Sequence, residues 1–215
     1  MEHKGFFLPH INPYAEKFFV TFVLFSDKIA EFYAGIKKEQ KVEIKKLKDL
    51  NDKESFLKIS IIRKKYFDIF DSFLGKNPVE GIDLTQENIA EIIIERLKLL
   101  DGKLYKLGAY CIMSNHVHIL FDTAEQLKNI DENVEINSLN FVNVSKIMQL
   151  IKGATSFEIN KILNRKGTLW LRDYWDHLVR NEKEFTNIAN YIAQNPVKAG
   201  LVDDWTKWRF TQIFG

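Results

Sequence analysis

The chain has 215 residues, of which 46% are hydrophobic and 28% charged, and its formal net charge is +2. This length suits one large globular domain, and so small a net charge neither requires nor excludes a nucleic-acid partner. The single cysteine, Cys111, excludes an intrachain disulfide. We see no apolar run of membrane-spanning length and no secretion signal, so we expect a cytoplasmic, nucleoid-associated protein of a bacterial cell.

The first third of the chain predicts a buried strand followed by charged helices. Aromatic and β-branched residues fill the run 18–25, which is typical of a buried strand. Ser26 and Asp27 then offer an N-cap for a helix. Apolar residues recur at helical spacing over 56–74, which predicts a second helix. We therefore expect a charged helical insertion at about 26–80.

A helix and two strands are predicted next. Thr85 is the expected N-cap of a helix over 86–100. Residues 105–113 predict an apolar strand, and a short turn at Ser114 and Asn115 leads directly into another apolar run. Two strands joined by so short a turn pair antiparallel.

The order of these elements indicates the fold class. Residues 122–137 are acidic without an apolar period and predict a loop. The next helix should begin at Asn143 or Ser145 and run to about Leu163. Strand, helices, two strands and a helix predict a single α+β domain over 1–215, in which helices pack on one face of a ferredoxin-like antiparallel sheet.

The last part of the chain predicts an aromatic cluster and a C-terminal helix. We expect Trp170 and Trp175 to form a small satellite core. Asn181 is the expected N-cap of a helix that runs to about Asn195, where the following proline ends it. Tyr191 lies beside the apolar stripe of this helix, one turn before Asn195 and on the same side.

Two histidines in the strand after residue 115 are the first candidate site. His116 and His118 alternate with Val117 and Ile119, so both imidazoles should point to the same face of a sheet. Two imidazoles on one rigid strand can bind one divalent metal ion from the same direction. They are equally compatible with surface residues on a half-exposed sheet, and the pair alone does not decide between the two interpretations.

Two stretches resemble a known family when they are read together. Tyr110-Cys-Ile-Met-Ser-Asn-His-Val-His-Ile-Leu120 resembles the histidine–hydrophobe–histidine motif of single-tyrosine transposases, and Tyr191-Ile-Ala-Gln-Asn-Pro-Val-Lys-Ala-Gly-Leu-Val202 resembles their tyrosine helix. The closest likeness is to the REP-associated tyrosine transposases. The resemblance covers most of 15–205 and is weakest in 26–80 and 122–142. Ser114 replaces a proline that is common in the family.

The resemblance implies roles for individual residues. His116 and His118 would bind a divalent ion, Mg²⁺ or Mn²⁺, with Asn195 completing the metal site. Tyr191, carried by the C-terminal helix, would be the catalytic nucleophile that forms a 5′-phosphotyrosine with DNA. His177 is a candidate general base.

The resemblance also implies a substrate and partners. We expect a metal-dependent endonuclease and strand transferase that acts in DNA transposition and recombination on single-stranded DNA, at hairpin-bearing repeats. The alternatives are a catalytically inactive DNA hairpin-binding protein of the same fold and a structural protein with an incidental histidine pair. Both a monomer and a homodimer are compatible with the family. Side chains that could contact DNA or phosphate, each also typical of a solvated surface, are Lys146, Lys152, Arg172, His177, Arg180 and Lys198.

Overall fold

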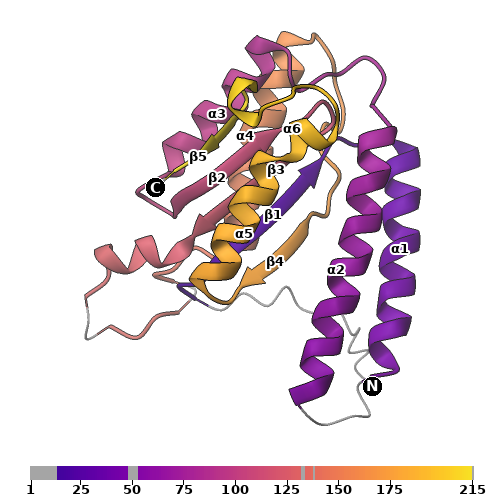
Figure 1. The fold of residues 1–215 in the computed structure, drawn as a ribbon. Helices are drawn as coiled ribbons and strands as arrows, with labels where there is room; N and C mark the ends of the chain where they lie inside the picture. The colour runs from indigo at the N-terminus through magenta and orange to yellow at the C-terminus, as the bar shows by residue number, and fades with distance from the viewer. Residues whose placement is uncertain (1–13, 48–52, 132–133, 138, 215) are drawn as a thin grey trace, which may run out of the picture.

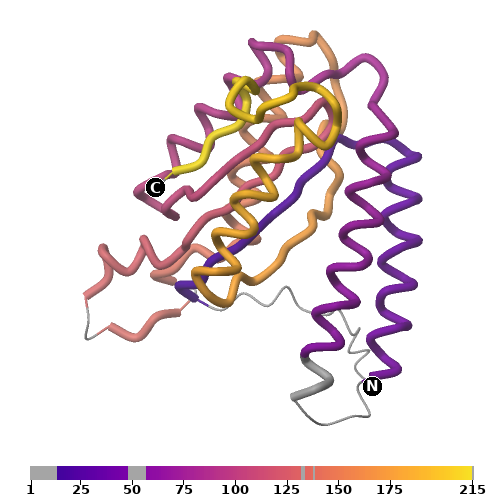
Figure 2. Tube along the Cα trace, viewed as in Figure 1, coloured from indigo at the N-terminus to yellow at the C-terminus, as the bar shows by residue number. Residues whose placement is uncertain are grey.

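The computed structural model describes residues 14–47, 53–131, 134–137 and 139–214. The elements in chain order are β1 (Lys17–Val23), α1 (Asp27–Lys45), α2 (Lys53–Lys76), α3 (Glu87–Leu100), β2 (Lys106–Ile112), β3 (His116–Asp122), the 3₁₀ helix η1 (Thr123–Asn129), α4 (Val144–Ile162), β4 (Trp175–Val179), α5 (Glu182–Ala193), α6 (Asn195–Lys198), the 3₁₀ helix η2 (Trp205–Lys207) and β5 (Thr211–Ile213). Figures 1 and 2 show their arrangement.

The centre of the molecule is a five-stranded antiparallel sheet in the order β4-β1-β3-β2-β5. The first four strands have the order and connections of a ferredoxin-like fold, with helices between β1 and β2 and between β3 and β4. The predicted α+β class and the antiparallel pairing of β2 with β3 are therefore confirmed. The histidine strand β3 is central, and its register places His118 opposite Thr21 of β1.

Helices cover both faces of the sheet, so the expectation of helices on one face was wrong. Along β1, Phe18, Val20 and Phe22 face the core under α3 and α4, whereas Phe19 and Val23 face the core under α2 and α5. Strand residues alternate between faces, and six of the seven residues of β1 are buried. Such a strand is buried on both sides, which a count of helices along the sequence does not reveal.

Side-chain capping marks the starts of α1, α4 and α5 but not those of α3 and α6. Ser26 caps α1 by accepting a hydrogen bond from the Ile29 backbone N–H, and Asn143 and Asn181 cap α4 and α5 in the same way. The prediction for Thr85 was wrong: its hydroxyl donates to Asp83, and α3 begins with an N-cap residue that makes no side-chain bond. The prediction of a loop over 122–137 is also wrong for residues 123–129, because these residues form η1.

The predicted satellite core around the two tryptophans does not form. Trp170 belongs to the core under α3 and α4, where its indole N–H donates to Thr155, whereas Trp175 belongs to the core on the other face. Trp175 starts β4, an edge strand that the sequence reading missed. Because β4 pairs with β1, its burial depends on a strand far away along the chain.

The helical pair α1 and α2 occupies the predicted insertion range and packs beside β4 (Figure 1). The rings of Phe32 and Phe73 stack at 3.8 Å between the two helices. Phe67 and Phe70 of α2 pack on Trp175, which attaches this helix to the sheet. One side of α2 therefore lies over the face of the sheet that carries the histidines. That residues 1–215 form a single domain remains a prediction.

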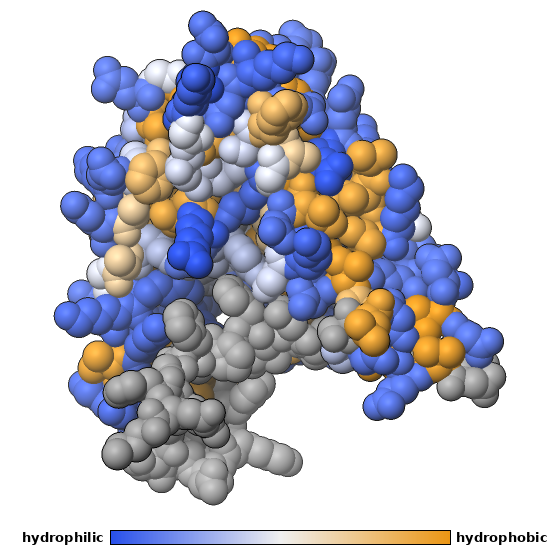
Figure 3. Space-filling view, turned by 180° about the vertical axis from the view of Figure 1, so that it is seen from behind, coloured by the Kyte–Doolittle hydropathy of each residue, from blue (hydrophilic) through white to orange (hydrophobic). Residues whose placement is uncertain are grey.

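Helix α5 runs diagonally across the same face, over β2 and β3 (Figure 1). A Cβ atom at Gly108 of β2 would clash with the ring of Phe185. Glycine at this position therefore allows α5 to approach the sheet closely, and α5 carries Tyr191. On the opposite side, the molecular surface mixes hydrophilic and apolar side chains (Figure 3). Within the described ranges, no helix combines the length and the apolar character needed to cross a membrane.

Candidate active site

The imidazoles of His116 and His118 lie side by side on the face of the sheet covered by α2 and α5. Their Nε2 atoms are 3.2 Å apart, and the two side chains are almost completely buried. The prediction that both point to one face is confirmed, and the alternative that they are surface residues is wrong. The two Nε2 atoms face each other in a buried setting, and a metal ion bound between them would use the lone pairs of both.

Hydrogen bonds at Nδ1 orient both rings. The Asn115 amide nitrogen donates to the backbone carbonyls of Leu74 and Asn77, at 2.9 and 2.8 Å. Its oxygen is therefore the acceptor in the 2.6 Å bond to Nδ1 of His116, which places the proton on Nδ1 and the lone pair on Nε2. Nδ1 of His118 is 2.7 Å from the Thr21 hydroxyl. Such outer partners are typical of histidines that bind metal.

A carboxylate that the sequence reading missed completes a cluster of three candidate ligands. Asp71 of α2 places Oδ1 3.3 Å from Nε2 of His118, and ligand atoms of Asp71, His116 and His118 all lie within 4.8 Å of one another. Helical spacing could have identified Asp71 from the sequence. It follows the buried Phe67 by four residues and precedes the buried Leu74 by three, so it lies in the apolar stripe of its helix. An acid in an apolar stripe calls for a partner in the core.

The protonation states of this cluster suit a divalent metal ion. Burial, together with the charge on His118, lowers the pKa of His116 to about 3, so its imidazole is neutral. Burial alone would raise the pKa of Asp71, but hydrogen bonding and charge from His118 hold it well below its usual range. Oδ1 of Asp71 is buried and lies 3.3 Å from Nε2 of His118. Two imidazole nitrogens and one carboxylate oxygen therefore fit a metal-ligand set.

Tyr191 lies directly beside this cluster. Its ring centroid is 5.8 Å from that of His118 and 5.9 Å from those of Phe19 and Phe67. Its hydroxyl is buried without a hydrogen-bond partner among the residues that the structure describes. Burial first, and then the Asp71 carboxylate, raise the pKa of the phenol far above its usual value. The structure thus brings Tyr191 from α5 to the face of the sheet that carries the histidines, as the family resemblance implied.

Asn195 lies at the start of α6, next to the tyrosine. The helix α5 ends at Ala193, as expected ahead of Pro196, but α6 follows at once with Asn195 as its first residue. The buried Asn195 amide nitrogen donates to the Tyr191 backbone carbonyl at 2.9 Å. Its predicted role as a metal ligand stays a prediction.

Three of the predicted DNA contacts lie near this face and have protein partners. The Lys198 ammonium is 4.2 Å from the centroid of the Tyr191 ring. Nε2 of His177 is 2.9 Å from a Glu184 carboxylate oxygen. The Arg180 guanidinium donates to the Ser60 hydroxyl at 3.0 Å. Of these, Lys198 is the one that touches the tyrosine.

The other three predicted contacts lie on or next to α4. Lys152 donates to the backbone carbonyls of Leu171 and Arg172, both at 2.7 Å, and burial lowers its pKa to about 8. Its ammonium thus holds the segment that leads into β4. Lys146 donates to Gln149, and the side chain of Arg172 is exposed.

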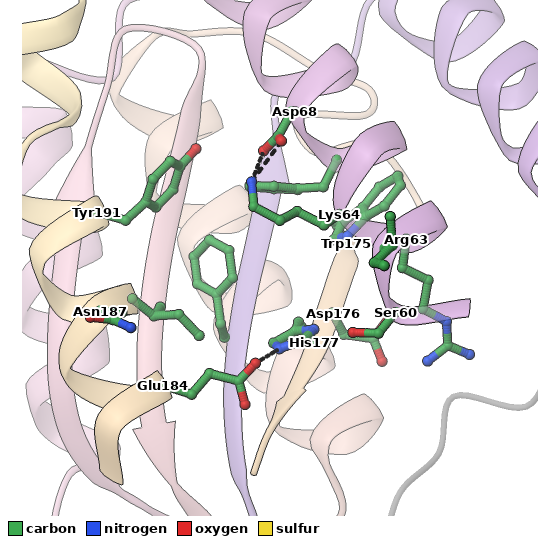
Figure 4. A pocket seen from close by; sticks show the side chains of 14 residues that line it. Ser60, Arg63, Lys64, Asp68, Trp175, Asp176, His177, Glu184, Asn187 and Tyr191 are labelled. Carbon is green, nitrogen blue, oxygen red and sulfur yellow. Dashed lines mark hydrogen bonds and ion pairs between the residues drawn. The ribbon is translucent and has the colours of Figure 1, made fainter. Parts of the chain in front are cut away.

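A pocket of about 330 Å³ opens beside Tyr191, between α2, β4 and α5 (Figure 4). Phe19 of β1 lies at its base, and Phe67 of α2 and Trp175 of β4 contribute aromatic walls. Charged side chains from all three elements surround it. The pocket therefore forms a continuous site with the tyrosine.

The fold and this site define an α+β protein with a histidine–histidine–aspartate cluster facing a buried tyrosine. The chain belongs to the IS200-like transposase family, whose sequence model, "Transposase IS200 like", matches residues 82–195. A "Putative REP-associated tyrosine transposase" of Haemophilus influenzae is 33% identical over 109 residues, which are 51% of this chain and 59% of the relative. The "REP-associated tyrosine transposase" of Escherichia coli is 37% identical over 43 residues, 20% of this chain and 26% of the relative.

The chain thus spans little more than half the length of the first of these curated relatives. A solved structure titled "Structure of the REP associates tyrosine transposase bound to a REP hairpin" aligns with a TM-score of 0.45 and 14% identity, and covers 98% of this chain and 82% of that one. The predicted family resemblance is confirmed by the match over residues 82–195.

Proposed function

We propose that this protein is a metal-dependent single-stranded DNA endonuclease and strand transferase that acts at hairpin-bearing repeats. The observation that carries the proposal is the position of Tyr191, whose ring lies 5.8 Å from that of His118 in the same chain. Membership of the IS200-like transposase family and the names of the curated relatives support it.

His116, His118 and Asp71 would hold the metal ion, with Asn195 as the additional ligand suggested by the resemblance. Neutral imidazoles and a carboxylate bind Mn²⁺ readily, and Mg²⁺ where oxygen ligands dominate. A bound divalent ion supplies Lewis-acid polarisation of a phosphate oxygen. Asn115 and Thr21 keep the two rings in the orientation that this requires.

Tyr191 would be the nucleophile in a balanced exchange of phosphate esters. Its phenol oxygen forms a bond to phosphorus while the bond from phosphorus to the 3′ oxygen breaks. The phenol loses one proton, and the departing 3′ oxygen takes up one. The 5′-phosphotyrosine keeps the energy of the ester, so another 3′ hydroxyl can reverse the step and join two strands.

The tyrosine would act in cis. Asp71, His116, His118 and Tyr191 all belong to one chain and already contact one another. A monomer would therefore contain the three proposed metal ligands of the cluster and the proposed nucleophile. Of the monomer and the homodimer, both of which are compatible with the family, we therefore favour the monomer for the cleavage step.

A denaturing gel tests the proposal directly. The protein is incubated with Mn²⁺ and a labelled pool of single-stranded hairpin oligonucleotides with randomised flanks. We expect a covalent protein–DNA adduct that Tyr191→Phe abolishes and Tyr14→Phe, an exposed tyrosine, retains. Hairpin binding without an adduct would instead support the inactive binding protein of the same fold.

A further inference from the structure

The pocket beside Tyr191 has no part in the chemistry described so far. We propose that it binds one unpaired nucleobase of the DNA strand, next to the phosphate that Tyr191 attacks. This inference rests on the proposed function for its substrate. It adds a base-binding site, formed by α2, β4 and α5, to the metal cluster (Figure 4).

The walls of the pocket suit a flat aromatic group. The rings of Phe67 and Trp175 are 5.7 Å apart at an angle of 52°, and Phe19 packs edge-on against Phe67 at 5.3 Å. Ile188 of α5 faces them from the other side. Unpaired bases bind to aromatic side chains of this kind, and Trp175 would contact the base by its edge, because Phe70 stacks on Trp175 and the Lys37 ammonium lies 3.8 Å from its centroid. A volume of about 330 Å³ is at the small end of the range for small-molecule sites.

The charges around the pocket argue against a phosphate as its occupant. Three carboxylates line it, Asp68, Asp176 and Glu184, against two fixed cations, Arg63 and Lys64. Lys64 is paired with Asp68 at 2.6 Å. His177 is likewise directed at Glu184. The balance disfavours an anion, whereas a neutral base can pack against the aromatic walls and offer its amine donors to the carboxylates at the rim.

The position of the pocket links the base to the reaction. Tyr191 lines the pocket and also contacts His118, so a strand whose phosphate reaches the hydroxyl would pass next to the pocket. The α2 wall lies outside residues 82–195, the range that matches the family. The β4 and α5 walls lie inside that range, so α2 would add this chain's own contribution to a base preference that the matched family core shares.

The first test uses the cleavage reaction. Adducts from the randomised pool are sequenced to find the scissile phosphate, and each flanking nucleotide is then replaced by an abasic residue. We expect one abasic position to lower adduct formation at least about fivefold, the smallest effect of losing one stacked base. Ile188→Trp, which fills the pocket, should lower it as much with the intact strand. Ile162→Trp, on an exposed position of α4, is the matched control.

The second test needs no cleavage and separates the two proposals. The protein is labelled with 5-fluorotryptophan, and the ¹⁹F signal of Trp175 is assigned with Trp175→Phe. We expect the signal to shift with a short single-stranded DNA of mixed sequence and not with a fully abasic strand of the same length.

Equal shifts with both strands, or no shift with either, would overturn the base-binding site even if the Tyr191 adduct forms. A base-dependent shift without any adduct would retain the pocket and overturn the proposed catalytic function. If every abasic strand forms adduct as well as the intact strand, the pocket has no role in the reaction. Ile61→Trp, on the α2 side of the pocket, repeats the test if Ile188→Trp fails to fold.

Discussion

Oδ1 of Asp71 lies 3.3 Å from Nε2 of His118, and these two atoms join α2 to the central strand of the sheet. The contact converts a pair of histidines into a cluster of three candidate ligands. It also places a carboxylate beside the Tyr191 phenol, whose pKa it raises after burial. Helix α2 is therefore part of the site, and its contribution can be measured.

Replacing Asp71 by asparagine should weaken metal binding. Asp71→Asn removes the only charged member of the candidate ligand set, so we expect the affinity for Mn²⁺ to fall at least about tenfold. Isothermal titration calorimetry measures this change. Asp68→Asn, three residues earlier on α2 and paired with Lys64, is the control and should bind Mn²⁺ as the wild type does. Equal affinities for all three proteins would remove Asp71 from the site.

Thr21 should matter for metal binding although it is not a ligand. Thr21→Val keeps the shape of the side chain but removes the hydroxyl that lies 2.7 Å from Nδ1 of His118. We expect about 10-fold weaker Mn²⁺ binding and about 1–3 kcal/mol lower unfolding free energy, because a buried ring nitrogen loses its partner. Urea unfolding without metal measures the second effect. A loss of stability with unchanged Mn²⁺ affinity would make Thr21 purely structural.

Tyr191→Phe should stabilise the metal-free protein while it abolishes the DNA adduct. The Tyr191 hydroxyl is buried and accepts or donates no hydrogen bond within the described structure. Removing an unsatisfied buried group should raise the unfolding free energy by about 1 kcal/mol. Urea unfolding of the two proteins in EDTA tests this. A destabilised variant would mean that the hydroxyl has a partner in solution.

Gly108 should determine how closely α5 approaches the sheet. In Gly108→Ala, the new methyl group meets the Phe185 ring at a distance that no structure tolerates without movement. We expect destabilisation of about 1–3 kcal/mol from overpacking. Phe185→Leu in the same chain should recover part of this loss, and a double-mutant cycle of unfolding free energies measures the coupling. Additive effects would show that the two residues do not interact.

Lys37 should make stability depend on pH in the alkaline range. Its ammonium lies 3.8 Å from the Trp175 ring, and burial first, then the charges of Arg63 and Lys41, lower its pKa from 10.5 to about 8 against the opposing effect of Asp176 and Asp173. Between these values the folded protein binds fewer protons than the unfolded chain, so stability should rise with pH from about 8 to 10.5.

The expected gain is on the order of 3 kcal/mol relative to Lys37→Met, which has no titrating group at this position. Unfolding free energies of both proteins across this pH range measure the difference. A constant difference between the two proteins would contradict a lowered pKa for Lys37.

Local patterns in the sequence predicted the parts of the site that lie on single elements. Alternation along a strand places His116 and His118 on one face, and helical spacing places Tyr191 and Asn195 on one side of α5 and its continuation. The caps Ser26, Asn143 and Asn181 depend on hydrogen bonds within one turn and were predicted for the same reason.

The sequence alone determined that a strand carries two histidines on one side and that a later helix carries a tyrosine, because these facts follow from the periods of strand and helix. Tertiary structure alone decided that Asp71 joins the histidines, that β4 extends the sheet, and that α2 and α5 enclose an aromatic pocket beside Tyr191. Each of these depends on burial between elements far apart in the chain. The period of a helix or strand does not specify which distant surface the element will cover. The position of Asp71 as third candidate ligand and the walls of the pocket therefore depend on tertiary packing.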